Sequence, residues 1–272
     1  MQEAAESVLS PQVALAGAVL AATGTAFAAV PLAMLRHAFP TREVRPVRWG
    51  VLHIVLVALL HQSIGSLLMG QAGPDPGFTI SLLATFAAQG IAVAAICYWV
   101  YKHDPAGWAG LGIRRSGNLR ALAVGGLAGL MSFPMILGTS FFWPWLFARM
   151  GGSFQVQAFV EGFAAASSSE LWLAIPLAVI VVPLFEEVIF RGFVQSLAVQ
   201  RLGEVPGILV TSALFASLHG SSSFLPIFAL AFVLGIVMAR TGRLVAAWAL
   251  HALFNGMQLA YLFTSQQLTL SP

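Results

Sequence analysis

Phe185-Glu186-Glu187-Val188-Ile189-Phe190-Arg191 places two adjacent carboxylates and an arginine inside an apolar segment that runs from Leu171 to about Leu197. A charged side chain at the centre of a bilayer costs roughly 3 kcal/mol on insertion scales, so intramembrane charges are usually paired and functional. Glu187 and Arg191 are four residues apart with the acid first, the favourable helical spacing for an ion pair. Glu186 has no such partner in this segment, so its protonation is the one that burial should perturb.

The composition around this segment is that of a polytopic membrane protein. The 272 residues are 58% hydrophobic, their mean hydropathy is +0.87, and only 8% of them are charged, against about 25% in ordinary soluble domains. The net charge is +3 and the pI is near 9.6, but the basic residues form no dense face. Nucleic acid is therefore excluded as a partner, and the lipid bilayer is the expected surroundings.

Apolar runs long enough to cross about 30 Å of hydrocarbon follow one another along the chain. The sequence predicts an all-α bundle of about eight helices in a single integral membrane domain, residues 1–272. Its N-terminal helices one to four fall in 1–150, and a catalytic core of helices five to eight falls in 171–264. The predicted spans are Pro11 to Leu35, Trp49 to Met69, Phe78 to Tyr101, Leu119 to Ala148, Leu171 to Val199, Pro206 to His219, Phe224 to Ala239 and Leu244 to Phe263. The sixth and seventh are short and are predicted to form either ordinary spans or a hairpin that lines a cavity.

The basic residues predict the orientation of the bundle, because Lys and Arg are retained on the cytoplasmic side. Eleven of the thirteen follow helices one, three, five or seven, which predicts both termini outside. They are Arg36, Arg42, Arg45, Arg48, Lys102, Arg114, Arg115, Arg120, Arg201, Arg240 and Arg243. The opposite loops hold Asp75, Glu161 and Glu170 with only Arg149. The loop 151–170 is predicted to be an amphipathic element or a gate.

Further side chains that could take part in catalysis lie in the later predicted helices. His219 ends helix six, with Phe215 four residues before it, and His251 and Asn255 lie four apart in helix eight, so each pair shares one helix face. A carboxylate and an imidazole can deprotonate water for attack on an amide carbonyl, while amide or imidazole N–H groups stabilise the oxyanion. Pro183, three residues before Glu186, is expected to kink the helix and open room for water.

The ordered motifs Glu186-Glu187-x-x-x-Arg191, Phe215-x-x-x-His219 and His251-x-x-x-Asn255 resemble the CPBP family of intramembrane proteases, which includes the CAAX prenyl endopeptidases and bacteriocin-processing, Abi-like relatives. The resemblance covers residues 186 to 255, and the first half of the chain is matched by hydropathy alone.

The resemblance implies a glutamate-type peptidase and a role for each motif residue. Glu186 with His219 would activate water, and His251 with Asn255 would form the oxyanion site. Glu187 and Arg191 would organise the site, with Glu187 able to share the base function, and Phe215 would support His219. Two Glu and two His are also a conceivable zinc ligand set. The chain has no His-Glu-x-x-His motif, so we expect no cofactor and no metal and keep zinc as the alternative.

These observations predict an endopeptidase that cuts a membrane-anchored protein or peptide, with C-terminal sorting or peptide maturation as the expected substrate class. The compact length and lack of a soluble domain favour a bacterial inner (cytoplasmic) membrane.

Two other functions stay open. A proton-coupled transporter would also use an intramembrane carboxylate, but it predicts inverted repeats, and the first half has no acidic counterpart within its helices. A non-catalytic scaffold or bacteriocin-immunity protein on the same fold would keep the same motifs, with the charged cluster serving only helix packing.

Overall fold

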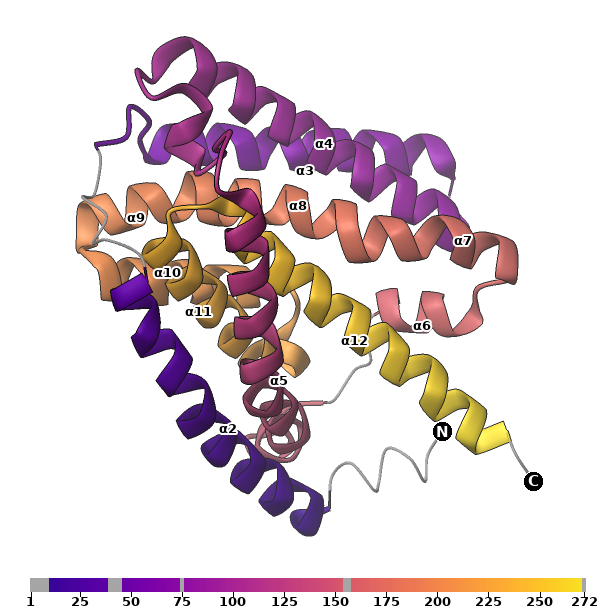
Figure 1. Ribbon diagram of the computed structural model, residues 1–272. Coiled ribbons are helices and arrows are strands. Elements are labelled where there is room, and N and C mark those ends of the chain that lie inside the picture. Colours follow the sequence, from indigo (N-terminus) through magenta and orange to yellow (C-terminus); the bar gives the residue numbers. More distant parts are fainter. Residues whose placement is uncertain (1–9, 39–45, 74–75, 154–157, 271–272) are drawn as a thin grey trace.

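Helices account for nearly all of the regular structure in the computed structural model (Figure 1). It describes residues 10–38, 46–73, 76–153 and 158–270, and none of these forms a strand. Arg42, Arg45 and Asp75, which entered the orientation prediction, lie outside the described residues, as does the side chain of Arg36. The main helices are α2 (Pro11–Ala38), α3 (Val51–Ala72), α4 (Gly77–His103), α5 (Asn118–Arg149), α6 (Ala158–Ala165), α7 (Ser168–Pro176), α8 (Val182–Glu187), α9 (Gln195–Leu202), α10 (Glu204–Ser217), α11 (Phe224–Thr241) and α12 (Leu244–Leu270).

The predicted polytopic bundle is confirmed. Six helical stretches among the described residues are long and apolar enough to cross a membrane, and they correspond to the first five predicted spans and the seventh. The sixth predicted span is the 14-residue helix α10, which is shorter than a bilayer crossing requires. Helix α12 is long, but His251, Asn255 and Gln258 lower its hydropathy. The two predicted spans that lack the length or the hydropathy for a membrane crossing, α10 and α12, therefore both lie in the C-terminal half.

Glycines allow the N-terminal helices to approach closely. Helix α2 packs mainly against α5, and a Cβ added to Gly17 would lie 2.8 Å from the carbonyl oxygen of Gly138. Gly24 and Gly138 are equally tight against the backbone of the facing helix. Small residues at such crossings are the usual means of association between membrane helices. Helix α3, by contrast, has no buried residue and packs along α4.

One long rod runs through the molecule from Ser168 to Leu202 and carries the charged motif (Figure 1). It is built from α7, α8 and α9, with two wider π-helical turns between them, η2 (Leu177–Val181) and η3 (Val188–Val194). In η2 the Val182 N–H bonds the Leu177 carbonyl, five residues back. The expected irregularity beside Pro183 is therefore a π turn. Such turns are frequent at functional sites and are a recognised cause of helix bending.

Helices α11 and α12 pack against α5, and α12 crosses the rod at α8 and η2 (Figure 1). The largest core cluster joins these three helices through residues such as Ile136, Leu234 and Leu250, all fully buried. A Cβ at Gly125 would overlap the backbone of Ala246, so α5 and α12 touch backbone to backbone. This close packing fixes the face of α12 that carries His251 and Asn255 against the rod.

Candidate active site

The predicted ion pair of the charged motif forms and is completely buried. Arg191 Nε donates to Glu187 Oε2 at 3.2 Å, and both side chains have 0% exposure. Glu187 ends α8 and Arg191 lies in η3, so the pair bridges the start of the second π turn. Removing one member would leave an uncompensated charge in the interior, which is far more costly than removing both.

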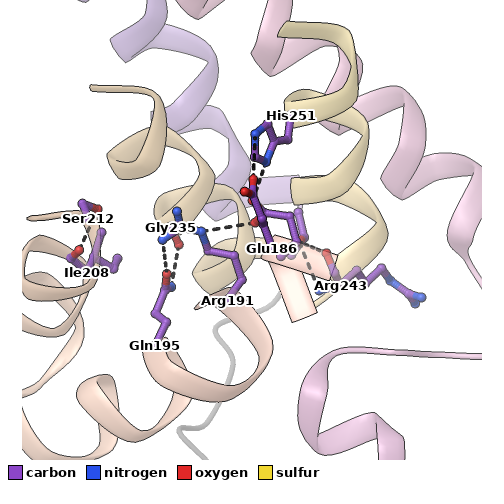
Figure 2. Close-up of polar contacts among 10 residues, drawn as sticks. Glu186, Arg191, Gln195, Ile208, Ser212, Gly235, Arg243 and His251 are labelled. Atoms are coloured by element: carbon purple, nitrogen blue, oxygen red, sulfur yellow. Dashed lines mark hydrogen bonds and ion pairs between the residues drawn. The ribbon is translucent and has the colours of Figure 1, made fainter. Parts of the chain in front are cut away.

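His251 reaches from α12 into this pair and contacts both acids. Its Nδ1 is 2.8 Å from Glu187 Oε1, and its Nε2 is 3.7 Å from Glu186 Oε2. Figure 2 shows His251 and Glu186 facing each other, with Arg191 on the same side of the rod. Glu186 keeps 14% of its side chain exposed, whereas Glu187 keeps none. The two adjacent acids therefore have different surroundings, one sealed in an ion pair and one at an accessible edge.

Hydrogen bonding assigns the protons around His251. Arg191 can only donate, so Glu187 accepts on Oε2, and an ionised Glu187 also accepts on Oε1 from His251 Nδ1–H. In the neutral imidazole, Nε2 then carries the lone pair on the side that faces Glu186. At 3.7 Å this second contact is longer than a hydrogen bond. The arrangement orients the imidazole through one acid and leaves its other nitrogen for proton transfer.

The aromatic ring of Phe215 joins the two histidines. It lies 4.5 Å from the His219 ring and 6.0 Å from the His251 ring, centroid to centroid, and it is buried. The Arg191 guanidinium carbon sits 5.4 Å from the same ring, within the range of a cation–π contact. His219 Nδ1 is 2.8 Å from the Phe215 carbonyl oxygen, so Nδ1 carries the proton and Nε2 is the acceptor of the neutral ring. Phe215 thus packs against Arg191 and both imidazoles.

Asn255 is held against the first π turn. Its Nδ2 donates to the Ala178 carbonyl at 3.0 Å, and two turns earlier on α12 Trp248 Nε1 donates to the Ile180 carbonyl at 2.8 Å. Trp49 makes the equivalent bond to Phe193 in η3, at 2.9 Å. Because a π turn disturbs the regular backbone ladder, its carbonyls can accept hydrogen bonds from side chains outside the rod. An amide has two N–H groups, so the bond to Ala178 leaves Asn255 a second donor.

One buried polar residue of the site was not predicted. Gln195 is 3% exposed; its Oε1 accepts from Arg191 Nη1 at 3.3 Å, and its Nε2 donates to the Gly235 carbonyl of α11 at 2.9 Å (Figure 2). The signal was present in the sequence, because Gln195 follows Arg191 by four residues and Glu187 by eight on an otherwise apolar segment.

The contacts bring most of the predicted residues together. Glu186, Glu187, Arg191 and His251 are linked directly, Phe215 contacts Arg191 and both imidazoles, and Asn255 is anchored one turn along α12 from His251. Across the described ranges, no three His, Cys, Asp or Glu side chains are grouped as a metal site requires. The metal-free mechanism stays a prediction.

Comparison with known families agrees with the motif. Residues 168–257 match the family model described as "Type II CAAX prenyl endopeptidase Rce1-like". This segment is therefore similar to the CAAX protease family. The match begins at the first residue of α7 and ends within α12, so all seven predicted site residues lie inside it. No curated protein and no solved structure gives a significant match to the chain.

The family match confirms the resemblance seen in the three motifs. A CAAX protease segment supports endopeptidase activity and a protein or peptide substrate at the level of the family. The family match and the six apolar helical stretches together indicate an integral membrane protein.

Proposed function

We propose that this protein is a glutamate-type intramembrane endopeptidase in which Glu186 is the general base. The observation that carries the proposal is the contrast between the two adjacent acids. Glu187 is sealed against Arg191 and His251, whereas Glu186 is partly exposed and faces His251 Nε2 at 3.7 Å. A base must reach both water and substrate, and Glu186 is the acid of the pair with that access.

The reaction balances without a cofactor. Glu186 takes a proton from water as the water oxygen bonds to the carbonyl carbon of the scissile peptide. The protonated Glu186 then gives that proton to the leaving nitrogen as the C–N bond breaks, which yields a carboxylic acid and an amine and restores the Glu186 carboxylate. His219, whose Nδ1 is committed to the Phe215 carbonyl, assists as a second proton acceptor through Nε2.

The oxyanion is proposed to be stabilised from α12. The second N–H of Asn255 is one donor on that helix, and His251 Nε2 is a second donor when the ring is an imidazolium that carries a proton on both nitrogens; both side chains are already fixed by bonds to the rod. Donors held in place before the reaction need no reorganisation in the transition state, which is why one such donor typically contributes about 10²–10³-fold in kcat. Arg191 holds Glu187, and Glu187 holds His251.

The substrate is proposed to be a membrane-anchored protein or peptide cut near a C-terminal sorting or processing segment. Glu186 lies within the rod from Ser168 to Leu202, which is apolar enough to cross the membrane, so a substrate anchored in the bilayer can reach it. The proposed location is a bacterial inner membrane, and no metal is required.

The test is cleavage by the purified full chain in nanodiscs, offered a panel of membrane-anchored peptides that includes a prenylated C-terminal peptide. Wild type is compared with Glu186→Ala and His219→Ala, with and without a chelator, and Glu161→Gln on the exposed helix α6 is the control. The proposal expects cleavage that both site variants abolish and that the chelator spares.

Two results would contradict it. Cleavage that persists in both site variants would refute the site, and cleavage lost with chelator and restored by zinc would refute the metal-free mechanism. A transporter would instead cut none of the peptides and would show proton flux that depends on Glu186.

A further inference from the structure

A continuous chain of buried polar groups connects five segments behind Glu186. It runs from His251 on α12 to Glu187 on α8, then to Arg191 in η3, Gln195 at the start of α9, and the Gly235 carbonyl on α11. The four residues that contribute side chains to it are at most 3% exposed. Nothing in the proposed reaction uses its far end, where Gln195 meets α11.

We propose that Gln195 is a positioning residue that sets the orientation of Arg191 and, through it, of Glu187 and His251. This inference rests on the proposed function of Glu186 and His251 and extends the site one turn further along the rod.

The amide of Gln195 has only one orientation that satisfies both neighbours. Arg191 has donors only, so it requires the carbonyl oxygen of the amide, and the Gly235 carbonyl is an acceptor only, so it requires the NH2 group. Both ends therefore select the same rotamer. Helix α11 acts on Arg191 through a group that cannot flip without losing two buried hydrogen bonds.

Helix α11 is shaped to receive this amide. A Cβ added to Gly235 would lie 3.0 Å from Gln195 Oε1 and 2.7 Å from Ile208 Cγ2. Any larger side chain at position 235 would press on the amide or on α10. The glycine thus allows the close approach on which the Gln195 bond depends, which explains why a residue of low helix propensity lies inside α11.

Without Gln195, Arg191 would be free to turn away from Glu187. A cavity of about 440 Å³ lies beside it, with Arg191, Gln195 and Ser196 in its lining. Arg191 Nη2 is buried and has no hydrogen-bond partner among the described residues. A guanidinium with an open neighbouring cavity and an unpaired amino group needs a second anchor to keep Nε on Glu187. Gln195 on Nη1 is that anchor.

The charged groups around Gln195 determine the electrostatic surroundings of a carboxylate introduced at position 195. Arg191 and Glu187 lie on its own rod, and Glu204 of α10 pairs with Arg240 of α11 at 2.6 Å near the same cavity. Asp104, which accepts a bond from the Ala106 N–H, and Arg48 line the cavity from the loops. A carboxylate at position 195 would therefore face one cation, Arg191, that already has a partner.

Two variants test the inference against the control Ser196→Ala, a neighbouring residue of the same cavity wall. Gln195→Met keeps the length of the side chain and removes both bonds, so we expect kcat to fall about 10- to 100-fold with KM little changed, because small misplacement of catalytic groups costs up to about 10²-fold. Gln195→Glu mimics the amide only when it is protonated, since its OH can donate to Gly235 while its carbonyl accepts from Arg191. The ratio of its kcat to the wild-type kcat at the same pH should approach one at low pH and fall as pH rises, whereas the same ratio for Ser196→Ala should not change with pH.

A second readout does not depend on catalysis. We expect the imidazole ¹⁵N signals of His251 in the nanodisc-bound chain to change in Gln195→Met and stay unchanged in Ser196→Ala, with His53 on α3 as the internal reference. Folded Gln195 variants with wild-type kcat, wild-type pH profile and unchanged His251 signals would overturn the inference while leaving the proposed function intact. If wild type cuts no peptide, the proposed function fails, and the His251 signals alone decide the inference. If Gln195→Met does not fold, the pH dependence of Gln195→Glu decides it.

Discussion

The two halves of this molecule hold their helices together by different means. In α2 and α5 the backbones meet at glycines, and the contact surface is apolar. In residues 168–257 the rod is joined to α11 and α12 by hydrogen bonds from Gln195, Trp248, His251 and Asn255. The carbonyls of Ala178 and Ile180 in η2 and of Phe193 in η3 accept hydrogen bonds from side chains elsewhere in the fold. The contacts of the rod with α11 and α12 are therefore polar and specific, as a catalytic site requires. We call the glycine-packed helices α2 and α5 the frame, because they support the fold without contributing a proposed catalytic group.

The largest effect expected from this contrast is on activity, at Glu186. Replacing it with Gln removes the proposed base while keeping its shape, so kcat/KM should fall about 10²- to 10⁴-fold. Its side chain is 14% exposed and belongs to no close ion pair, so thermal unfolding in detergent should change little. Steady-state cleavage and unfolding of the same preparation measure both. A large loss of stability with activity per folded molecule retained would show that Glu186 is part of the frame.

The next effect is on stability, at the buried pair. Glu187→Leu leaves Arg191 as an uncompensated charge in the interior and should destabilise the protein by about 3–5 kcal/mol. The double variant Glu187→Leu with Arg191→Leu should regain much of that loss, because the isolated charge is gone, yet it should remain inactive because His251 has lost its partner. A double-mutant cycle of unfolding free energies measures the coupling. Additive losses would mean that the two side chains do not interact.

The third effect concerns the frame. Gly17→Ala places a methyl group 2.8 Å from the Gly138 carbonyl, so α2 must shift away from α5; we expect a loss of about 1–3 kcal/mol, typical of overpacking. The matched control is Gly126→Ala on α5, where a Cβ meets nothing within 4 Å and alanine should be neutral or stabilising by up to about 1 kcal/mol. Cleavage per folded molecule should be unchanged in both. A selective loss of kcat in Gly17→Ala would refute the division into frame and site.

Sequence patterns predicted the frame more completely than the site. Each predicted span coincides with a helical segment of the structure. Such spans can be predicted because apolar length and flanking charges are local properties of the sequence. The Glu187 and Arg191 pair also follows from spacing on one helix. The contact of His251 with both acids needed the crossing of α12 over the rod, which no local pattern contains.

Backbone irregularity was harder still to predict. Pro183 indicated a disturbed helix, but the wider turns at Leu177–Val181 and Val188–Val194 depend on donors that arrive from elsewhere in the fold. Trp248 and Trp49 carry no motif, and their partners are carbonyls, which every residue has. The sequence shows Gln195 only as a further polar residue at helical spacing from Glu187 and Arg191. Contacts between a side chain and a distant carbonyl leave no pairwise signal in a single sequence.

The smallest predicted effect tests whether the donors to the π turns serve the site. Trp248→Phe removes one N–H from the Ile180 carbonyl in η2 and keeps an aromatic ring. Trp108→Phe removes a similar bond, at 3.1 Å, to the Cys97 carbonyl of α4. Each should lower stability by about 1 kcal/mol, the usual net value of one hydrogen bond.

The two tryptophan variants should differ in catalysis. Ile180 lies two residues beyond Ala178, which holds Asn255, so a relaxed η2 would move the proposed oxyanion donor, whereas α4 carries no proposed catalytic group. We expect kcat to fall several-fold in Trp248→Phe and to stay at the wild-type value in Trp108→Phe, with KM unchanged in both. Equal kcat values would mean that the π turn keeps its shape without this bond, and that Asn255 alone secures the crossing of α12 over the rod.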